Sequence, residues 1–592
     1  MRLLFTVTLL PVLISIQSYA NPVQFAGDLK STSQNIKTWI QNEFGVSTCG
    51  SLAKDFYSPL YTHLFTGTPQ ARFSEAQLTG LDAKDPKNSL VTLFEARMLL
   101  RDKFLRMTAE EQFANRQEFQ SCANQVRAAM RTIRSWEEQF SLYWAKKNNQ
   151  TAEVKNKEDL SRYDLKWPTW MVHPDWRGKF NGIESIQAGD ILLSRGDAFT
   201  SAVISRIGSV DNQFSHLAMV TEENGRKYVL ESELNGGLQM VTLESYLSVT
   251  KSRWVILRMK NIGSGDSTPA SQVAKLAAAW LADQARPGVT DPRKKIPYNF
   301  GMDMLDRTQM FCSQAISFAI EAACSMPGIR CNSVNKYVNP KILPFPLSYT
   351  SFNLDQNPLI KMLQIKVTET FAPADVEEEP SLELIAEYKN LAQIEEARMF
   401  DMILTKMFLW MEKEGYTFAD SAVIIGASEV ADVIVKKMGK MPENQPKSFT
   451  QGSIILYFLM MHTGPGSQLA DLVNQINYKL LGEKLGQLVK SGALTKAQAD
   501  EITKKAPAVA ERLSRHVGFV THLKRFSIAY EKHFKQPFSE YDMDLALEEI
   551  RVEDCARVQS GQPALFHDIF GKKFDGDVQT RCSTEKLNWS DF

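Results

Sequence analysis

Two apolar segments, far apart in the chain, constrain its fold more than any other feature. In the first, Phe214–Val220 (FSHLAMV), a histidine is followed by apolar residues and preceded by a polar loop, which is typical of a buried strand. In the second, Met310–Phe318 (MFCSQAISF), apolar residues begin to recur at helical spacing and predict a helix with Cys312 on its first turn. The fold therefore combines strands with a helix that begins near a cysteine.

These segments carry a possible chemistry. A thiol at a helix N-terminus is favoured as thiolate, because the macrodipole and the unpaired N–H groups stabilise negative charge. His216 on a neighbouring strand is then a candidate base, and the pair is what a cysteine hydrolase needs. Glu231 ends the predicted strand Tyr228–Glu231, which pairs with the His216 strand, so its carboxylate can hold the imidazole. Glu233 is the alternative carboxylate, and a solvated strand end is the alternative interpretation of Glu231.

The first twenty residues predict export. They hold one positive charge, an apolar run and a small-x-small ending at Ser18 and Ala20, the pattern of a secretory signal removed before Asn21. An uncleaved membrane anchor is the alternative. No later stretch is long enough to span a bilayer, and Ile454–Met461 is interpreted as a core helix. We expect a periplasmic or secreted protein without a transmembrane span.

Length and charge exclude some classes. A chain of 592 residues predicts two to four domains, and 68 Lys and Arg against 68 Asp and Glu, with no basic stripe, argue against a nucleic-acid partner. The histidines are dispersed and no zinc motif occurs, so no metal is expected. The polar loop Gly263–Ser267 lacks a P-loop lysine, and no other cofactor is expected.

The seven cysteines lie in separate regions of the sequence. In an exported protein cysteines tend to pair, and an odd one is a candidate free thiol. Pairing within these regions leaves Cys312 alone and gives, as a hypothesis, the bridges Cys49–Cys122, Cys324–Cys331 and Cys555–Cys582.

Secondary-structure patterns divide the mature chain into three parts. Residues 21–180 form an N-terminal helical domain and linker, in which Leu90–Lys147 is helical and Trp167–Trp176 is a Pro-rich linker with indoles tucked against the next domain and an interfacial His173. A carbohydrate-stacking surface is the alternative for those tryptophans. Residues 181–390 are a hydrolase-like domain, and residues 391–592 are a C-terminal helical domain with a disulfide-pinned tail.

The central part is α+β, with a small and mostly antiparallel sheet. The predicted strands are Ala188–Ser194, Ser215–Thr221, Lys227–Glu231, Gly237–Val241 and Trp254–Met259. Helices are expected over Ala198–Ile207 and Ser271–Gln284, and again after Pro380, over Leu382–Glu412, Thr417–Met441 and much of Gln451–His533. The acidic run Glu377–Glu379 is interpreted as a solvated linker.

A family resemblance sharpens this interpretation. It rests on GDIL at Gly189, the FSHLAMV segment, VLES at Val229, PYN at Pro297, FCSQ at Phe311 and FAPADV at Phe371. In this order they resemble the circularly permuted papain-like hydrolases of the NlpC superfamily, in the YiiX/YebB-like branch, over roughly Ile183–Ala386. The resemblance implies that Cys312 is the nucleophile, His216 the general base and Glu231 the orienting carboxylate. It implies a substrate pocket near Tyr298, Ser313, Gln314 and Ser215.

Two positions depart from that family. It often has an acid where this chain has Asn299 and a Glu where it has Gln314. An amide still bridges by hydrogen bonding, so no catalytic atom is lost.

The implied function is an exported cysteine hydrolase that cleaves an amide or peptide bond through a thioester acyl-enzyme, for example in peptidoglycan-derived peptides. A lipid-acting thiol acyl hydrolase or acyltransferase is one alternative. A catalytically silent binding or scaffold protein is another, because the helical flanks offer surfaces for a protein partner.

Overall fold

The computed structural model describes residues 29–50, 52, 86–150, 159–196, 204–205, 213–233, 237–249, 251–261, 268–299, 301–331, 350–351 and 367–394, with a few isolated positions between 486 and 560. The predicted signal, the helices predicted beyond residue 394, Ile454–Met461, Cys555 and Cys582 lie outside the described residues, as does most of Ala198–Ile207.

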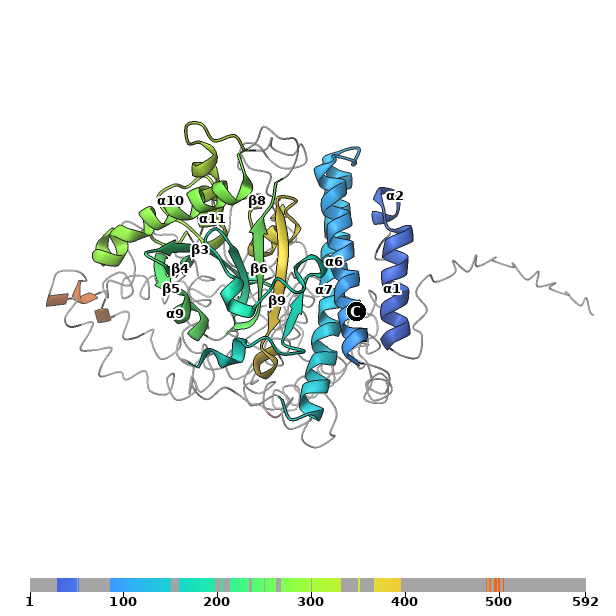
Figure 1. Ribbon diagram of the computed structural model, residues 1–592. Coiled ribbons are helices and arrows are strands. Elements are labelled where there is room, and N and C mark those ends of the chain that lie inside the picture. The colour runs from blue at the N-terminus through green and yellow to red at the C-terminus, as the bar shows by residue number, and fades with distance from the viewer. Residues whose placement is uncertain are drawn as a thin grey trace, which may run out of the picture.

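The N-terminal part is helical, as predicted. Its helices are α1 (Leu29–Glu43), α2 (Val46–Cys49), α6 (Pro86–Ala109) and α7 (Arg116–Lys147). The long stretch free of Gly and Pro divides before α7, where the Asn115 side chain accepts the Glu118 N–H at 2.9 Å and caps the new helix. In Figure 1, α6 and α7 stand beside strand β9 and α1 lies outside them.

The central part is a seven-stranded sheet, and every neighbouring pair in it is antiparallel. Its spatial order is β1-β9-β6-β2-β3-β4-β5. The bounds are β1 Trp170–Val172, β2 Ile191–Gly196, β3 His216–Glu223, β4 Arg226–Glu233, β5 Gly237–Thr242, β6 Lys251–Met259 and β9 Leu382–Lys389. The five strands predicted in the central segment are β2 to β6, and the chain has the predicted α+β class. A separate pair joins β7 (Thr350–Ser351) to β8 (Glu369–Thr370).

Helices cover both faces of the sheet (Figure 1). Helices α10 (Ala270–Thr290) and α11 (Cys312–Cys324) share one apolar core with alternate strand residues such as Leu193, Leu217, Met219 and Leu230. Helix α9 (Leu243–Ser248) packs on the other face, against Leu192, Val220, Val229 and Trp254. Short 3₁₀ helices span Leu160–Tyr163, Pro174–Trp176, Gly182–Ser185, Pro292–Lys294 and Pro373–Glu378.

The prediction of a helix from Leu382 is wrong at its start. Residues 382–389 form β9, which lies between β1 and β6. Leu, Glu and Ala favour a helix in isolation, but propensity is weak beside burial in the middle of a sheet. Leu384, Ile385 and Ala386 are all buried, which is the continuous burial of a strand covered on both faces.

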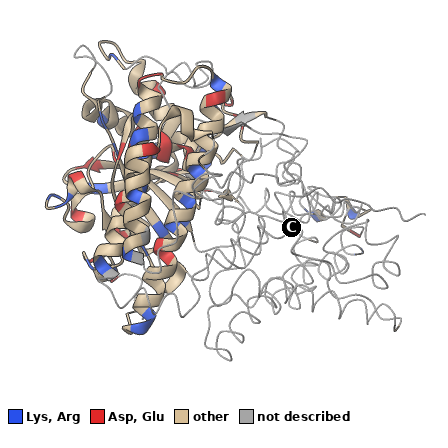
Figure 2. Ribbon diagram, turned by 90° about the vertical axis from the view of Figure 1, so that its right-hand side faces the viewer, with Lys and Arg blue, Asp and Glu red and all other residues tan. Residues whose placement is uncertain are grey.

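The interpretation of Glu377–Glu379 as a solvated linker is also wrong, because all three residues are buried. Arg134 of α7 forms an ion pair with Glu377, and Arg127 of the same helix pairs with Glu378. The acidic run is buried because cations distant in sequence compensate it. Figure 2 shows basic and acidic residues interspersed along the helices on that side of the molecule.

The Trp-rich segment is packed rather than open. Trp170 lies in β1 and its ring centroid is 5.2 Å from that of Trp254. His173 is buried, with Nε2 3.2 Å from the Asp102 carboxylate on α6. Trp170 thus packs against the sheet and His173 against α6, and the segment contributes a strand as well.

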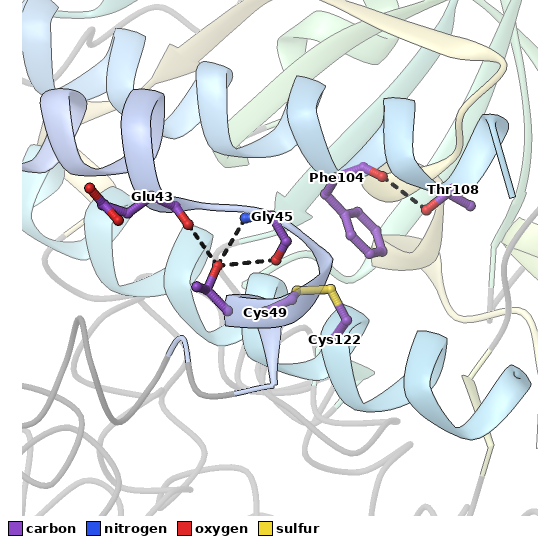
Figure 3. The surroundings of a disulfide bond; sticks show 7 residues. Glu43, Gly45, Cys49, Phe104, Thr108 and Cys122 are labelled. Atoms are coloured by element: carbon purple, nitrogen blue, oxygen red, sulfur yellow. Dashed lines mark hydrogen bonds between the residues drawn. A yellow bond between two sulfur atoms is a disulfide. The ribbon is translucent and has the colours of Figure 1, made fainter. Parts of the chain in front are cut away.

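Two of the hypothesised disulfides are present. Cys49–Cys122 joins α2 to α7 (Figure 3), and Cys324–Cys331 closes a short loop after α11. Within the described part of the chain, Cys312 is the free cysteine.

Removing the first bridge is expected to cost more stability than removing the second. Cys49 and Cys122 are 73 residues apart in sequence, and the chain-entropy relation gives about 4 kcal/mol for a loop of that size. Cys324 and Cys331 are 7 apart, for which the relation gives about 2.5 kcal/mol. Urea unfolding of the two double-alanine variants measures both losses. Equal losses, or the reverse order, contradict this prediction.

Candidate active site

Cys312 is the first residue of α11. Phe311 before it is extended, with φ −89° and ψ 168°, and the Gln314 side chain accepts the Phe311 N–H at 3.2 Å, which fixes the start of the helix. The backbone N–H groups of Leu217 and Ser313 donate to the Cys312 sulfur. Only 3% of Cys312 is exposed. The thiol therefore lies between a helix N-terminus and the start of β3.

His216 bridges this thiol and a carboxylate. As the first residue of β3 it lies opposite Ser194 of β2. Its Nε2 is 2.8 Å from Glu231 Oε2, and its side chain also hydrogen-bonds to Cys312. The structure thus brings the three predicted residues into one hydrogen-bonded series.

Charge is favoured on all three groups. Burial raises the pKa of the Cys312 thiol, but the hydrogen bond and charge of His216 bring the pKa below its ordinary value. Burial lowers the pKa of His216, and its bonds with Cys312 and Glu231 raise it to about 10. Burial likewise raises the pKa of Glu231, yet the pairing with His216 leaves that pKa lowered. The arrangement stabilises a thiolate, an imidazolium and a carboxylate near neutral pH.

Strand register decides which carboxylate meets His216. Asn224 and Gly225 connect β3 to β4, and Glu231 lies opposite Ala218 on β3. It is therefore a diagonal neighbour of His216 on one face of the sheet. Glu231 is 4% exposed, whereas Glu233, where β4 ends, is exposed. The structure places Glu231 against the imidazole.

Sequence reasoning missed Gln239. It lies opposite Glu231 on β5, and its Nε2 donates to Glu231 Oε1 at 3.2 Å. The donation satisfies the carboxylate oxygen that does not face His216. The predicted strand Gly237–Val241 was the available signal, but a strand prediction does not fix the register between β4 and β5.

Tyr298 lies beside Cys312. Burial raises the pKa of Tyr298 well above its usual range, as do the Cys312 charge and the hydrogen bond between the two side chains. The phenol thus stays a hydroxyl and can donate to the sulfur.

The other predicted pocket residues are buried and hydrogen-bonded within the protein. Ser313 Oγ donates to the Phe371 carbonyl, and Ser215 Oγ accepts the Gly196 N–H at 3.4 Å. Gln314 donates to the carbonyls of two loop residues, Asp303 and Asp306, at 2.9 and 2.8 Å. These contacts give the three side chains positioning roles, and their contact with substrate stays a prediction.

Asn299 and Gln314, the two positions that depart from the resembled family, form a hydrogen bond with each other. Asn299 Nδ2 donates to Gln314 Oε1 at 3.0 Å and to the Asp303 carbonyl at 2.9 Å. The two side-chain amides thus bridge the loop at Asp303 and the first turn of α11. Unlike a carboxyl group, an amide does not titrate, so this bridge does not depend on pH.

Among the residues that the structure describes, no group of three or more His, Cys, Asp or Glu side chains forms a metal site. No helix in those ranges is long and apolar enough for a membrane span.

No family model matches the sequence, and a search of the curated proteins found no significant match. Among solved structures, the chain is similar to the metalloprotein YiiX (DUF1105) from Escherichia coli O157:H7. That similarity has 18% sequence identity and a TM-score of 0.24, and it covers 34% of this chain and 96% of the other.

Proposed function

We propose that the protein is a cysteine hydrolase that cleaves an amide or peptide bond, with Cys312 as nucleophile, His216 as general base and acid, and Glu231 as the orienting carboxylate. The observation that carries the proposal is the hydrogen-bonded series of these three side chains at the start of a buried helix. The order of the histidine strand before the cysteine helix further supports a permuted papain-like fold of the YiiX/YebB type.

The reaction proceeds in two halves. The Cys312 thiolate attacks the carbonyl carbon, and N–H groups at the start of α11 stabilise the developing oxyanion. The His216 imidazolium gives its proton to the leaving amine as the C–N bond breaks, which leaves a thioester. Neutral His216 then takes a proton from water, the resulting hydroxide attacks the thioester, and the acid product leaves as the thiolate returns.

The proposed compartment favours one class of substrate. Two disulfides favour an oxidising environment, as the predicted export signal does. We therefore place the substrate outside the cytoplasm and favour amide or peptide bonds such as those of peptidoglycan-derived peptides.

The pH dependence of Cys312 alkylation tests the site without knowledge of the substrate. In the wild type, the iodoacetamide rate is expected to plateau well below the ordinary thiol pKa of about 8.5. In His216→Ala the Cys312 sulfur no longer has an imidazolium beside it. An ordinary thiol is only about 1% ionised at pH 6.5, so the alkylation rate at that pH is expected to fall by roughly a hundredfold.

His173→Ala is the matched control, because His173 is buried and also pairs with a carboxylate but follows β1, which three strands separate from the His216 strand β3. Its profile is expected to equal that of the wild type. Hydrolysis of peptide, amide and acyl-lipid substrates, with Cys312→Ala as blank, then identifies the bond. The proposal is contradicted if the wild-type thiol ionises near pH 8.5 and its alkylation profile is the same in His216→Ala.

A further inference from the structure

A close backbone contact lies beside the proposed active site. Gly237, the first residue of β5, has φ +62°, and a Cβ built on it would lie 2.0 Å from the Ile296 carbonyl oxygen. The next residue, Leu238, donates its N–H to that same oxygen at 2.8 Å. A side chain at position 237 therefore cannot coexist with this contact, because the obstacle is backbone and cannot rotate away.

The segment that approaches Gly237 is also tied to the start of the cysteine helix. The Pro297 carbonyl accepts the Met310 N–H at 2.9 Å, and the Met310 carbonyl accepts the Ser232 hydroxyl of β4. Residues 296–297 thus link the edge strand β5 to the residues immediately before Cys312. Tyr298, whose side chain hydrogen-bonds to Cys312, follows directly.

We propose that Gly237 is a positioning residue for the active site: its missing side chain lets residues 296–298 approach β5 and so places the Tyr298 hydroxyl against the Cys312 sulfur. The inference rests on the proposed function, since the hydroxyl matters as a donor to a reactive thiolate. The ionisation of Cys312 depends on His216 of β3 and on the N–H groups of Leu217 and Ser313, and Tyr298 hydrogen-bonds to the sulfur. Behind the imidazole lie the charged groups Glu231 and Glu233 of β4 and Lys251 of β6.

The test measures the alkylation rate of Cys312 in the full chain between pH 3 and pH 10, in the wild type, Gly237→Ala, Tyr298→Phe and the double variant. Loss of a hydrogen bond to the charged form raises a pKa, so the low-pH inflection is expected to move up by about one pH unit in both single variants. Because both changes remove the same donor, the double variant is expected to match Tyr298→Phe.

Gly225→Ala is the matched control. Gly225 also has a positive φ, +76°, but no atom lies within 4 Å of its built Cβ, so this variant carries the backbone strain without the collision. Its inflection is expected to equal that of the wild type. Thermal unfolding is measured in parallel. A general loss of packing lowers the unfolding temperature without moving the inflection of the alkylation profile, and so is distinguished from a loss of the Tyr298 hydrogen bond.

The outcomes separate the two proposals. A depressed wild-type inflection that stays unchanged in Gly237→Ala or in Tyr298→Phe overturns the inference and leaves the proposed function standing. So does a Gly225→Ala shift as large as that of Gly237→Ala, or a double variant in which both shifts add. A wild-type inflection near pH 8.5 overturns both. Should Gly237→Ala fail to fold, Tyr298→Phe still decides whether the hydroxyl acts on the thiolate.

Discussion

Replacing Glu387 by glutamine is expected to lower the free energy of unfolding by about 3–5 kcal/mol, the usual cost of removing one member of a buried ion pair. Its carboxylate lies 2.8 Å from Arg97, 3.2 Å from Arg134 and 3.9 Å from Lys389, and all four side chains are buried. Arg134, Arg97 and Lys389 hold the pKa of Glu387 well below its usual range even though burial acts to raise it. Without this charge, buried cations lose a counter-ion and cannot reach water.

Urea unfolding at several pH values measures the effect. The folded-state pKa of Glu387 is depressed, so its contribution is present above the unfolded pKa of about 4.3 and is lost as pH falls below it. The difference in free energy of unfolding between Glu387→Gln and the wild type is therefore expected to become smaller at acidic pH. Glu383→Gln is the matched control on the same strand, because the amide oxygen can still accept the Trp176 indole N–H that Glu383 accepts at 3.1 Å. A Glu387→Gln loss below about 1 kcal/mol, or one independent of pH, contradicts this account.

A chain that begins at residue 151 is expected not to fold at all. Without α6 and α7, Glu387 loses Arg97 and Arg134, and Arg253 of β6 loses Glu138, whose two oxygens lie 2.6 and 3.0 Å from its guanidinium. Several ion pairs would be lost together, and the apolar surface that α6 and α7 share with the sheet would be exposed at about 25 cal/mol for each Å², against a total stability of about 5–15 kcal/mol for a typical protein.

Expression of that chain, with soluble yield and cooperative thermal unfolding as measurements, tests the expectation. A chain that begins at Leu29 keeps the helices and is the control, with near-normal unfolding expected. Soluble, cooperatively unfolding protein from residue 151 onward would show that residues 21–150 are dispensable for the fold. The expected failure would place α6 and α7 in the same folding unit as the sheet.

Local patterns were sufficient for much of the fold and the site. Strands β2 to β6 follow from short apolar runs between turn residues, and the continuous burial of β2, β3 and β6 is that of strands covered on both faces. Cys312 was found because a helix start has a recognisable apolar periodicity, and His216 because it heads a strand. Glu231 was one of two candidate carboxylates, and the register of β3 against β4 decided between it and Glu233. Each signal spans a few residues that are neighbours in both the sequence and the structure.

Only the tertiary structure decided the remainder. Residues 382–389 have the composition of a helix and became a strand because β1 and β6 offered pairing and burial on both sides. Glu377 could be buried because Arg134, 243 positions earlier, lies against it. Gln239 met Glu231 through a register that no local pattern encodes. For β9 and Glu377 the deciding energy comes from a partner distant in sequence, and for Gln239 it comes from a strand register. Neither a charge nor a strand edge identifies its partner until the chain is folded.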